Sequence, residues 1–182
     1  VPGESLDLDY AFERVLVDVD GRPLLLTAGK DGILWKLDRR DGTYVDLTET
    51  IHQDVFATVD RAHGKLTYRP DIAASRIGQP IAYCPGLFGG RNWPASAYSP
   101  RNGALFLPLM QICGTLVPDK VDAKIGGGGN GAVPDYRSYL REMPGTGGQA
   151  GRLDAYDVRT LKLRWSHTQR APFTAAALAT AG

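Results

Sequence analysis

The sequence lacks several features that would assign it to a common functional class. It contains no long apolar run and therefore no candidate membrane span. Its formal net charge is +1, which indicates neither a nucleic-acid surface nor a polyanionic partner. Its three histidines, His52, His63 and His167, have no cysteine or carboxylate at zinc-ligand spacing, and no Gly-x-Ser-x-Gly nucleophile motif occurs. We interpret the histidines as surface or packing residues.

Cysteine is also scarce, with only Cys84 and Cys113, which lie beside strand-like sequence. A disulfide between them would close a loop of moderate length and would imply an oxidising compartment. Two unrelated buried thiols would have the same spacing, so the spacing alone does not decide between them. No signal peptide is visible, and both termini are abrupt. We therefore expect the chain to be a piece of a larger fold.

Convincing helical periodicity is missing as well, whereas short strands bounded by turn residues are frequent. The 22 glycines and 12 prolines stand mostly between apolar runs, and Asp20-Gly21 is a strong turn dipeptide. This pattern predicts an all-β, antiparallel architecture. The expected strands are Val15–Val19, Leu24–Ala28, Ile33–Asp38 and one that starts at Thr43.

A weak internal repeat aligns residues 31–42 with residues 151–161. Both copies contain a glycine, an apolar strand with an aromatic residue, an aspartate and a basic turn. The aspartate is Asp38 in one copy and Asp157 in the other, where its side chain can bond the backbone N–H groups of the turn. Recurring hairpins of this kind predict the blades of a β-propeller.

The stretch from Cys84 to Pro100 is the most informative segment. A hairpin is expected over residues 97–108, and a hairpin does not need the Gly-Gly-Arg-Asn-Trp sequence that precedes it. That sequence places an aromatic ring and a planar amide on flexible backbone, which suits a planar, oxygen-rich ligand. By contrast, residues 118–150 are expected to form a glycine-rich excursion loop, either a plain surface loop or a lid on the substrate or partner side. Their tetraglycine is no phosphate cradle, because no strand precedes it and no Gly-Lys-Ser/Thr follows.

Taken together, these motifs resemble the pyrroloquinoline-quinone (PQQ) dependent alcohol dehydrogenases, quinoproteins of the methanol and ethanol dehydrogenase type. The resemblance rests on five segments in matching order: residues 6–9, 30–39, 84–93, 98–100 and 151–157. It implies an eight-bladed β-propeller longer than this chain. Residues 1–182 would be part of that single domain, a slice of a few four-stranded blades that completes the propeller with the remaining blades of the same enzyme.

The resemblance also implies a role for individual residues. Asp7 matches the catalytic base beside the metal, and Asp9 matches a carboxylate that lanthanide-using members carry as an extra metal ligand. Lys30 matches the basic residue that bonds the quinone oxygens, and Asn92 and Trp93 match a pair that touches the cofactor. Without the resemblance, the ordinary interpretations are solvated aspartates, an exposed turn lysine and a packed hairpin cap.

The implied function is oxidation of an alcohol, or of a related hydroxyl or aldehyde compound, by hydride transfer to PQQ with Ca²⁺ or a lanthanide ion as Lewis acid. Cytochrome c or a similar acceptor would take the electrons, the location would be periplasmic, and Cys84 and Cys113 would form a disulfide. Leu6 and Leu8 replace the aromatic residues of the family, which leaves the substrate open. The alternative is a non-catalytic propeller that acts as a binding or assembly scaffold.

Overall fold

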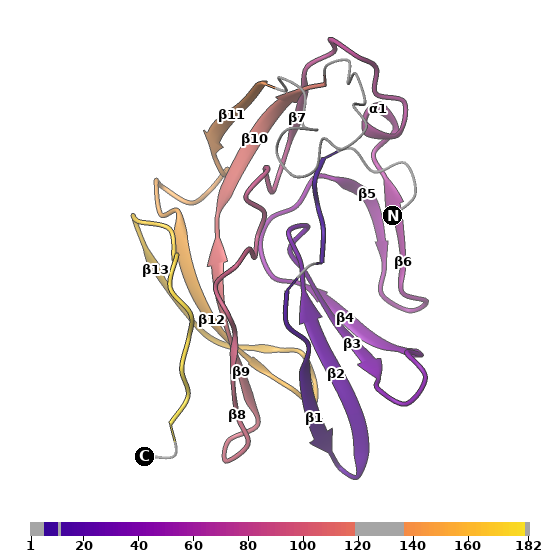
Figure 1. Ribbon diagram of the computed structural model, residues 1–182, viewed down its shortest axis with the longest axis vertical. Coiled ribbons are helices and arrows are strands. Elements are labelled where there is room, and N and C mark those ends of the chain that lie inside the picture. The colour runs from indigo at the N-terminus through magenta and orange to yellow at the C-terminus, as the bar shows by residue number, and fades with distance from the viewer. Residues whose placement is uncertain (1–5, 11, 119–136, 181–182) are drawn as a thin grey trace, which may run out of the picture.

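The computed structural model describes residues 6–10, 12–118 and 137–180, and this part of the chain is almost entirely β-structure (Figure 1). Its single described helix, α1 (Pro70–Ala73), has four residues. No helix in these residues has the length and apolar character needed to cross a bilayer. The antiparallel all-β class predicted from the turn pattern is therefore confirmed.

The first sheet is a four-stranded antiparallel meander in the order β1-β2-β3-β4. Its first and third strands have the bounds expected from the sequence, because a two-residue Asp20-Gly21 turn and the turn at residues 29–32 fix the register on either side of the second strand. The strands are β1 (Val15–Val19), β2 (Arg22–Ala28), β3 (Ile33–Asp38) and β4 (Tyr44–Glu49).

A second four-stranded antiparallel sheet has the order β13-β12-β9-β8. Its first hairpin is the one expected over residues 97–108, and its third strand comes from beyond the excursion. The strands are β8 (Ala97–Ser99), β9 (Ala104–Met110), β12 (Gly151–Asp157) and β13 (Leu163–Gln169).

The internal repeat is visible as backbone geometry, since β3 and β12 are the third strands of their sheets. In both strands a register shift falls two residues before the closing aspartate. In both turns the aspartate accepts a backbone N–H two residues later, from Arg40 at 3.0 Å and from Arg159 at 2.9 Å. The left-handed turn position is Gly42 (φ 78°) in one copy and Leu161 (φ 54°) in the other.

The facing sides of the two sheets share one apolar core. Alternate residues of β1 and β2, such as Val17, Leu24 and Leu26, point into it, and β9 contributes Leu105, Leu107 and Leu109. Lys36 of β3 is also buried there, where its ammonium donates to the carbonyl of Arg159 at 2.6 Å. Burial lowers the pKa of Lys36. This stacking of repeated four-stranded sheets is the packing expected of neighbouring propeller blades.

A three-stranded sheet in the order β11-β10-β7 and the hairpin β5–β6 extend from one end of this pair (Figure 1). The disulfide between Cys84 and Cys113 joins the end of β7 to β10, with Cα atoms 4.4 Å apart, and confirms the expected pairing. The bounds are β5 (Phe56–Asp60), β6 (Lys65–Tyr68), β7 (Ile81–Tyr83), β10 (Ile112–Val117) and β11 (Arg137–Glu142).

The strand β11 corrects one expectation, because it lies inside the stretch 118–150 that was expected to be a loop. It pairs with β10 over the full length of both strands. The backbone groups on that edge of β10 need hydrogen-bond partners, and the short Tyr-Leu segment supplies them although glycines dominate the sequence around it. Residues 119–136, which include the tetraglycine, lie outside the described part.

Replacing both Cys84 and Cys113 by serine is expected to lower the free energy of unfolding by about 3–4 kcal/mol, because the cross-link closes a loop of 29 positions in the unfolded chain. Urea unfolding of the full-length protein measures the change. A dithiol reductant should shift the wild-type midpoint to that of the double variant and leave the variant unchanged. An unaltered midpoint in the variant would contradict the expectation.

Candidate functional site

The segment before β1 presents its two aspartates on one side and its two leucines on the other. Leu6 and Leu8 are buried in a second apolar cluster, whereas the side chains of Asp7 and Asp9 are 59% and 44% exposed. Asp7 has a left-handed backbone (φ 59°), a conformation that aspartate tolerates better than most residues. Leu6 and Leu8 therefore anchor the segment, and the carboxylates project from it.

Lys30 lies in the turn between β2 and β3, and its ammonium group meets both carboxylates. The Nζ atom is 2.8 Å from Oδ2 of Asp7 and 2.7 Å from Oδ1 of Asp9, and only 8% of the residue is exposed. Burial alone would lower the pKa of Lys30. The hydrogen bonds and negative charges of the two aspartates outweigh that effect and raise the pKa of Lys30 above its ordinary value. Lys30 is thus a cation at neutral pH.

A short polar network holds the acidic segment against this turn. The Tyr10 hydroxyl donates to the carboxylate of Asp31 and accepts from the indole N–H of Trp35 at 2.8 Å. The same carboxylate accepts the backbone N–H of Ile33 at 3.0 Å and so shapes the turn that carries Lys30. Burial and the neighbouring Asp31 charge raise the pKa of Tyr10 well above its usual value. The network fixes residues 9 and 10 relative to residues 30 and 31.

Asp9 is accessible from a cavity of about 640 Å³ between the outer face of the first sheet and the hairpin β5–β6. The walls are mostly aromatic and aliphatic, and they carry a few charged groups. They include Leu8, Tyr10, Arg14, Trp35, Phe56 and Tyr68.

The glycine-rich loop after β7 lies directly on the backbone of Lys30. The Gly90 N–H donates to the carbonyl of Lys30 at 2.8 Å. Gly89 has a φ of 71°, and a Cβ atom at this position would overlap the Cα and Cβ atoms of Lys30. Only glycine permits this approach. The Gly-Gly pair is therefore required for close packing of the loop on the lysine turn.

Asn92 and Trp93 stand on this loop, but no hydrogen bond of their side chains to Lys30 is recorded in the described structure. The Asn92 amide donates to the carbonyl of Phe88 at 3.1 Å and accepts the backbone N–H of Trp93 at 3.0 Å. The Trp93 side chain packs edge-on against Phe12, with ring centroids 5.9 Å apart, while 80% of the residue is exposed. Trp93 therefore presents most of its ring surface to the outside.

Two charged residues at this site, Arg91 and Glu13, have no role in the sequence-based assignment. The Arg91 guanidinium is fully buried and forms an ion pair with Glu13. Partial burial would raise the pKa of Glu13, but hydrogen bonds from Arg91 and Ser96 lower it to about 2. The stability that this carboxylate contributes is thus present above about pH 4.5 and lost as the pH falls toward 2. In the sequence, only the position of Arg91 beside Asn92 could have indicated that Arg91 belongs to this site. Nothing in the sequence indicated that Glu13 does.

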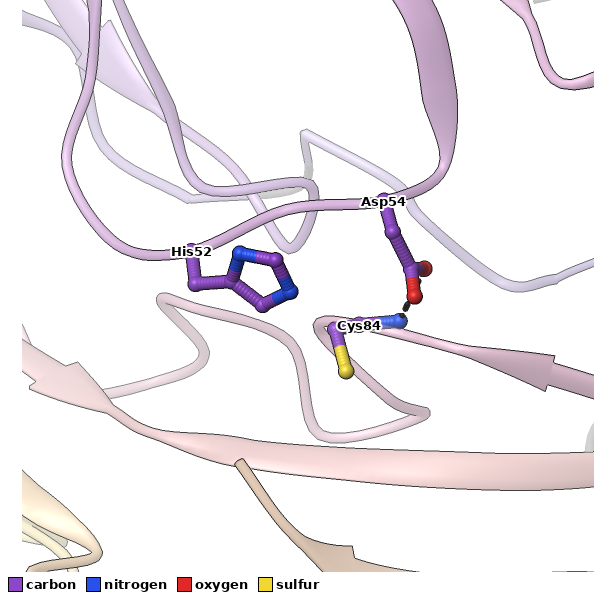
Figure 2. A group of neighbouring side chains, drawn as sticks. All are labelled: His52, Asp54 and Cys84. Carbon is purple, nitrogen blue, oxygen red and sulfur yellow. Dashed lines mark hydrogen bonds between the residues drawn. The ribbon is translucent and has the colours of Figure 1, made fainter. Parts of the chain in front are cut away.

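Figure 2 shows a second group of three potential ligands, His52, Asp54 and Cys84. A metal-binding sulfur must be a thiolate, and the sulfur of Cys84 is bonded to Cys113. Asp54 already accepts the backbone N–H of Cys84 at 2.7 Å and pairs with Arg69 at 3.0 Å. We therefore assign Asp54 a structural role and assign no metal centre to the three residues.

The repeated stacked sheets, with a buried cation and two carboxylates at one end of the first sheet, define part of a β-propeller with a charged cluster. Solved structures support this fold. A europium-containing methanol dehydrogenase superposes with a TM-score of 0.77 at 20% identity, over 94% of this chain and 31% of that one. The quinohemoprotein alcohol dehydrogenase from Comamonas testosteroni gives a TM-score of 0.66 at 26% identity, over 90% of this chain and 25% of that one.

Sequence comparison identifies the relatives as quinoprotein alcohol dehydrogenases. The Comamonas testosteroni quinohemoprotein alcohol dehydrogenase is 28% identical over 190 residues, with 100% of this chain and 26% of the relative covered. The lanthanide-dependent methanol dehydrogenase of Methylorubrum extorquens is 28% identical over 194 residues, with coverages of 100% and 32%. No protein-family model matches. The resemblance seen in the sequence is thereby confirmed, and the chain spans about a quarter to a third of the length of these relatives.

Replacing Gly89 by alanine is expected to destabilise the protein and displace Lys30, because the new methyl group overlaps the Lys30 backbone. Gly21 is a matched control: its φ is 75°, yet a Cβ there meets nothing within 4 Å. The control should lose only about 1 kcal/mol, the penalty of a left-handed alanine. Urea unfolding and a crystal structure of each variant measure the two effects. Equal losses with Lys30 unmoved would contradict the prediction.

Proposed function

We propose that the full-length protein is a periplasmic quinoprotein dehydrogenase that oxidises an alcohol or a related hydroxyl or aldehyde compound. The observation that carries the proposal is the convergence of Asp7 and Asp9 on the buried ammonium of Lys30. Names of the relatives support it, since they include methanol, ethanol and quinohemoprotein alcohol dehydrogenases. A propeller that served only as a scaffold would not need a buried lysine that meets two carboxylates.

The donor set fits the proposed metal and cofactor. The carboxylates of Asp7 and Asp9 lie close together, because an oxygen of each contacts the ammonium nitrogen of Lys30. Carboxylate oxygens are the hard donors that Ca²⁺ and lanthanide ions prefer. Lys30 is a charged hydrogen-bond donor, and a charged donor binds a quinone oxygen more strongly than a neutral one. Asn92 supplies a planar amide and Trp93 an open aromatic face on the loop that covers Lys30. Asp7 and Asp9 would therefore hold the metal, and Lys30, Asn92 and Trp93 would hold PQQ.

In this proposal each protein residue has a defined task. The bound quinone and metal supply the acceptor for a hydride and a Lewis acid for its carbonyl. Asp7 accepts the hydroxyl proton of the alcohol at a carboxylate oxygen. The ammonium of Lys30 stabilises negative charge that develops beside it, and it needs no reorganisation because it is already fixed between two aspartates. The electrons then pass to cytochrome c or a similar acceptor, as the name of one relative, a methanol dehydrogenase [cytochrome c] subunit, suggests.

Replacing Asp7 by asparagine is expected to lower the turnover number at least about 100-fold, because an amide cannot accept the hydroxyl proton. Dye-linked alcohol oxidation by the full-length protein, loaded with PQQ and Ca²⁺ or La³⁺, measures this. The control is Asp18→Asn. Asp18 lies on β1, and its exposed carboxylate pairs with Arg39. Equal turnover in both variants would refute the role of Asp7, and a wild-type protein that binds no quinone and shows no turnover would favour the scaffold.

Replacing Asp9 by asparagine is expected to weaken La³⁺ binding about tenfold more than Ca²⁺ binding, because a trivalent ion gains more from a second carboxylate. Calorimetric titration of the full-length protein with each ion gives the two dissociation constants. The Asp18→Asn variant should bind both ions like the wild type. Parallel losses for the two ions would show that Asp9 does not discriminate between them.

A further inference from the structure

Arg91 has the largest fully buried side chain in the described residues, with 1% of its surface exposed. Its guanidinium reaches two segments that are remote in sequence and a third position in its own loop. One N–H donates to the carbonyl of Ala28 at 3.1 Å, two residues before Lys30. Another pairs with Glu13, four residues after Asp9, and lies 3.4 Å from the carbonyl of Pro94 in its own loop.

Glu13 extends this connection by a second set of contacts. The carboxylate oxygen that meets Arg91 also accepts the Ser96 backbone N–H at 2.8 Å and the Ser96 hydroxyl at 2.7 Å. The loop is therefore bonded to Glu13 in the N-terminal segment at two residues, Arg91 and Ser96. Removal of the charge on Glu13 would weaken its bonds to both residues.

An aromatic contact completes the arrangement. The Arg91 guanidinium carbon lies 5.3 Å from the centre of the Phe12 ring, within the range of a cation–π interaction. The same ring meets Trp93 edge-on. Phe12 thus links the buried cation to the exposed indole that is proposed to contact the cofactor.

We propose that Arg91 is the positioning residue of this site, because its guanidinium holds three segments together. The first carries Asp7 and Asp9, the second carries Lys30, and the third carries Asn92 and Trp93. This inference rests on the proposed function, since it concerns the same five residues. Arg91 touches neither metal nor quinone in this scheme and acts through the segments that it joins. Lysine cannot replace it, because an ammonium group lacks the planar fork that reaches several acceptors at once.

The first test uses the cofactor-free full-length protein and so does not depend on the proposed function. Hydrogen exchange of backbone amides should accelerate in Arg91→Lys at least tenfold in three regions together, residues 6–13, 28–32 and 86–96. The matched control is Arg152→Lys, which alters an ion pair to the buried Asp154 within β12. The control should leave these regions unchanged. Acceleration confined to residues 86–96 would overturn the proposal.

The second test measures PQQ binding by quenching of protein fluorescence, and steady-state kinetics after reconstitution. Arg91→Lys should raise the dissociation constant of PQQ at least tenfold, while Arg152→Lys binds as the wild type even if its thermal midpoint falls. A lower midpoint in Arg91→Lys with unchanged PQQ affinity would reduce Arg91 to a stabilising residue and overturn the proposal. A wild-type protein that binds no PQQ would instead refute the proposed function, and the exchange experiment would still decide the role of Arg91.

A third comparison shows whether Arg91 and Glu13 act as a unit. Glu13→Gln should raise the dissociation constant of PQQ by a smaller factor, and the double variant should be no worse than Arg91→Lys alone. Additive effects would overturn the shared role.

If Arg91→Lys does not fold, Ser96→Ala removes one donor to Glu13 without altering the buried cation. It should accelerate exchange in residues 6–13 and 86–96 together, and unchanged exchange there would contradict the proposal.

Discussion

The site depends on one constraint, which is that the buried ammonium of Lys30 must be compensated. A charge removed from water is strongly unfavourable unless opposite charges replace the lost hydration. Asp7 and Asp9 supply that compensation, and Tyr10 and Asp31 hold the segment that brings them there. The covering loop then excludes water from the lysine backbone, which is possible only because two glycines carry no side chain. The two aspartates, the turn that carries Lys30 and the glycine-rich loop therefore depend on one another.

Much of the fold could be predicted because its signals are local. An aspartate–glycine turn fixes a hairpin register, and the turn residues on either side of β3 set the bounds expected for that strand. The repeat predicted equivalent strands, and β3 and β12 are equivalent in their sheets. The strand β11 was not foreseen, because its place depends on the open edge of β10 and not on a pattern of its own. A strand whose pairing partner is distant in the sequence leaves little pattern in the residues around it.

The same distinction explains the candidate site. The sequence motif placed Asp7, Asp9 and Lys30 in one hypothesis, and the structure places their charged groups in contact. It could not show that the Asn92 amide is already bonded within its own loop, nor that Glu13 is the partner of Arg91 from 78 positions away. An ion pair between distant segments depends on how the chain is folded, and a single sequence contains no direct record of it.

The repeated turn after β3 and β12 has a consequence for the history of the chain. Gly42 is exposed, whereas Leu161, at the equivalent left-handed position, is almost completely buried in the core between the two sheets. The second copy thus has the backbone path of its counterpart, with a leucine in a conformation that is unfavourable for it, and this leucine adds an apolar side chain to the core. If the two copies descend from one ancestral hairpin, the hydrogen-bonded frame was the inherited trait. Side chains at its corners were then free to diverge toward the different neighbours of each copy.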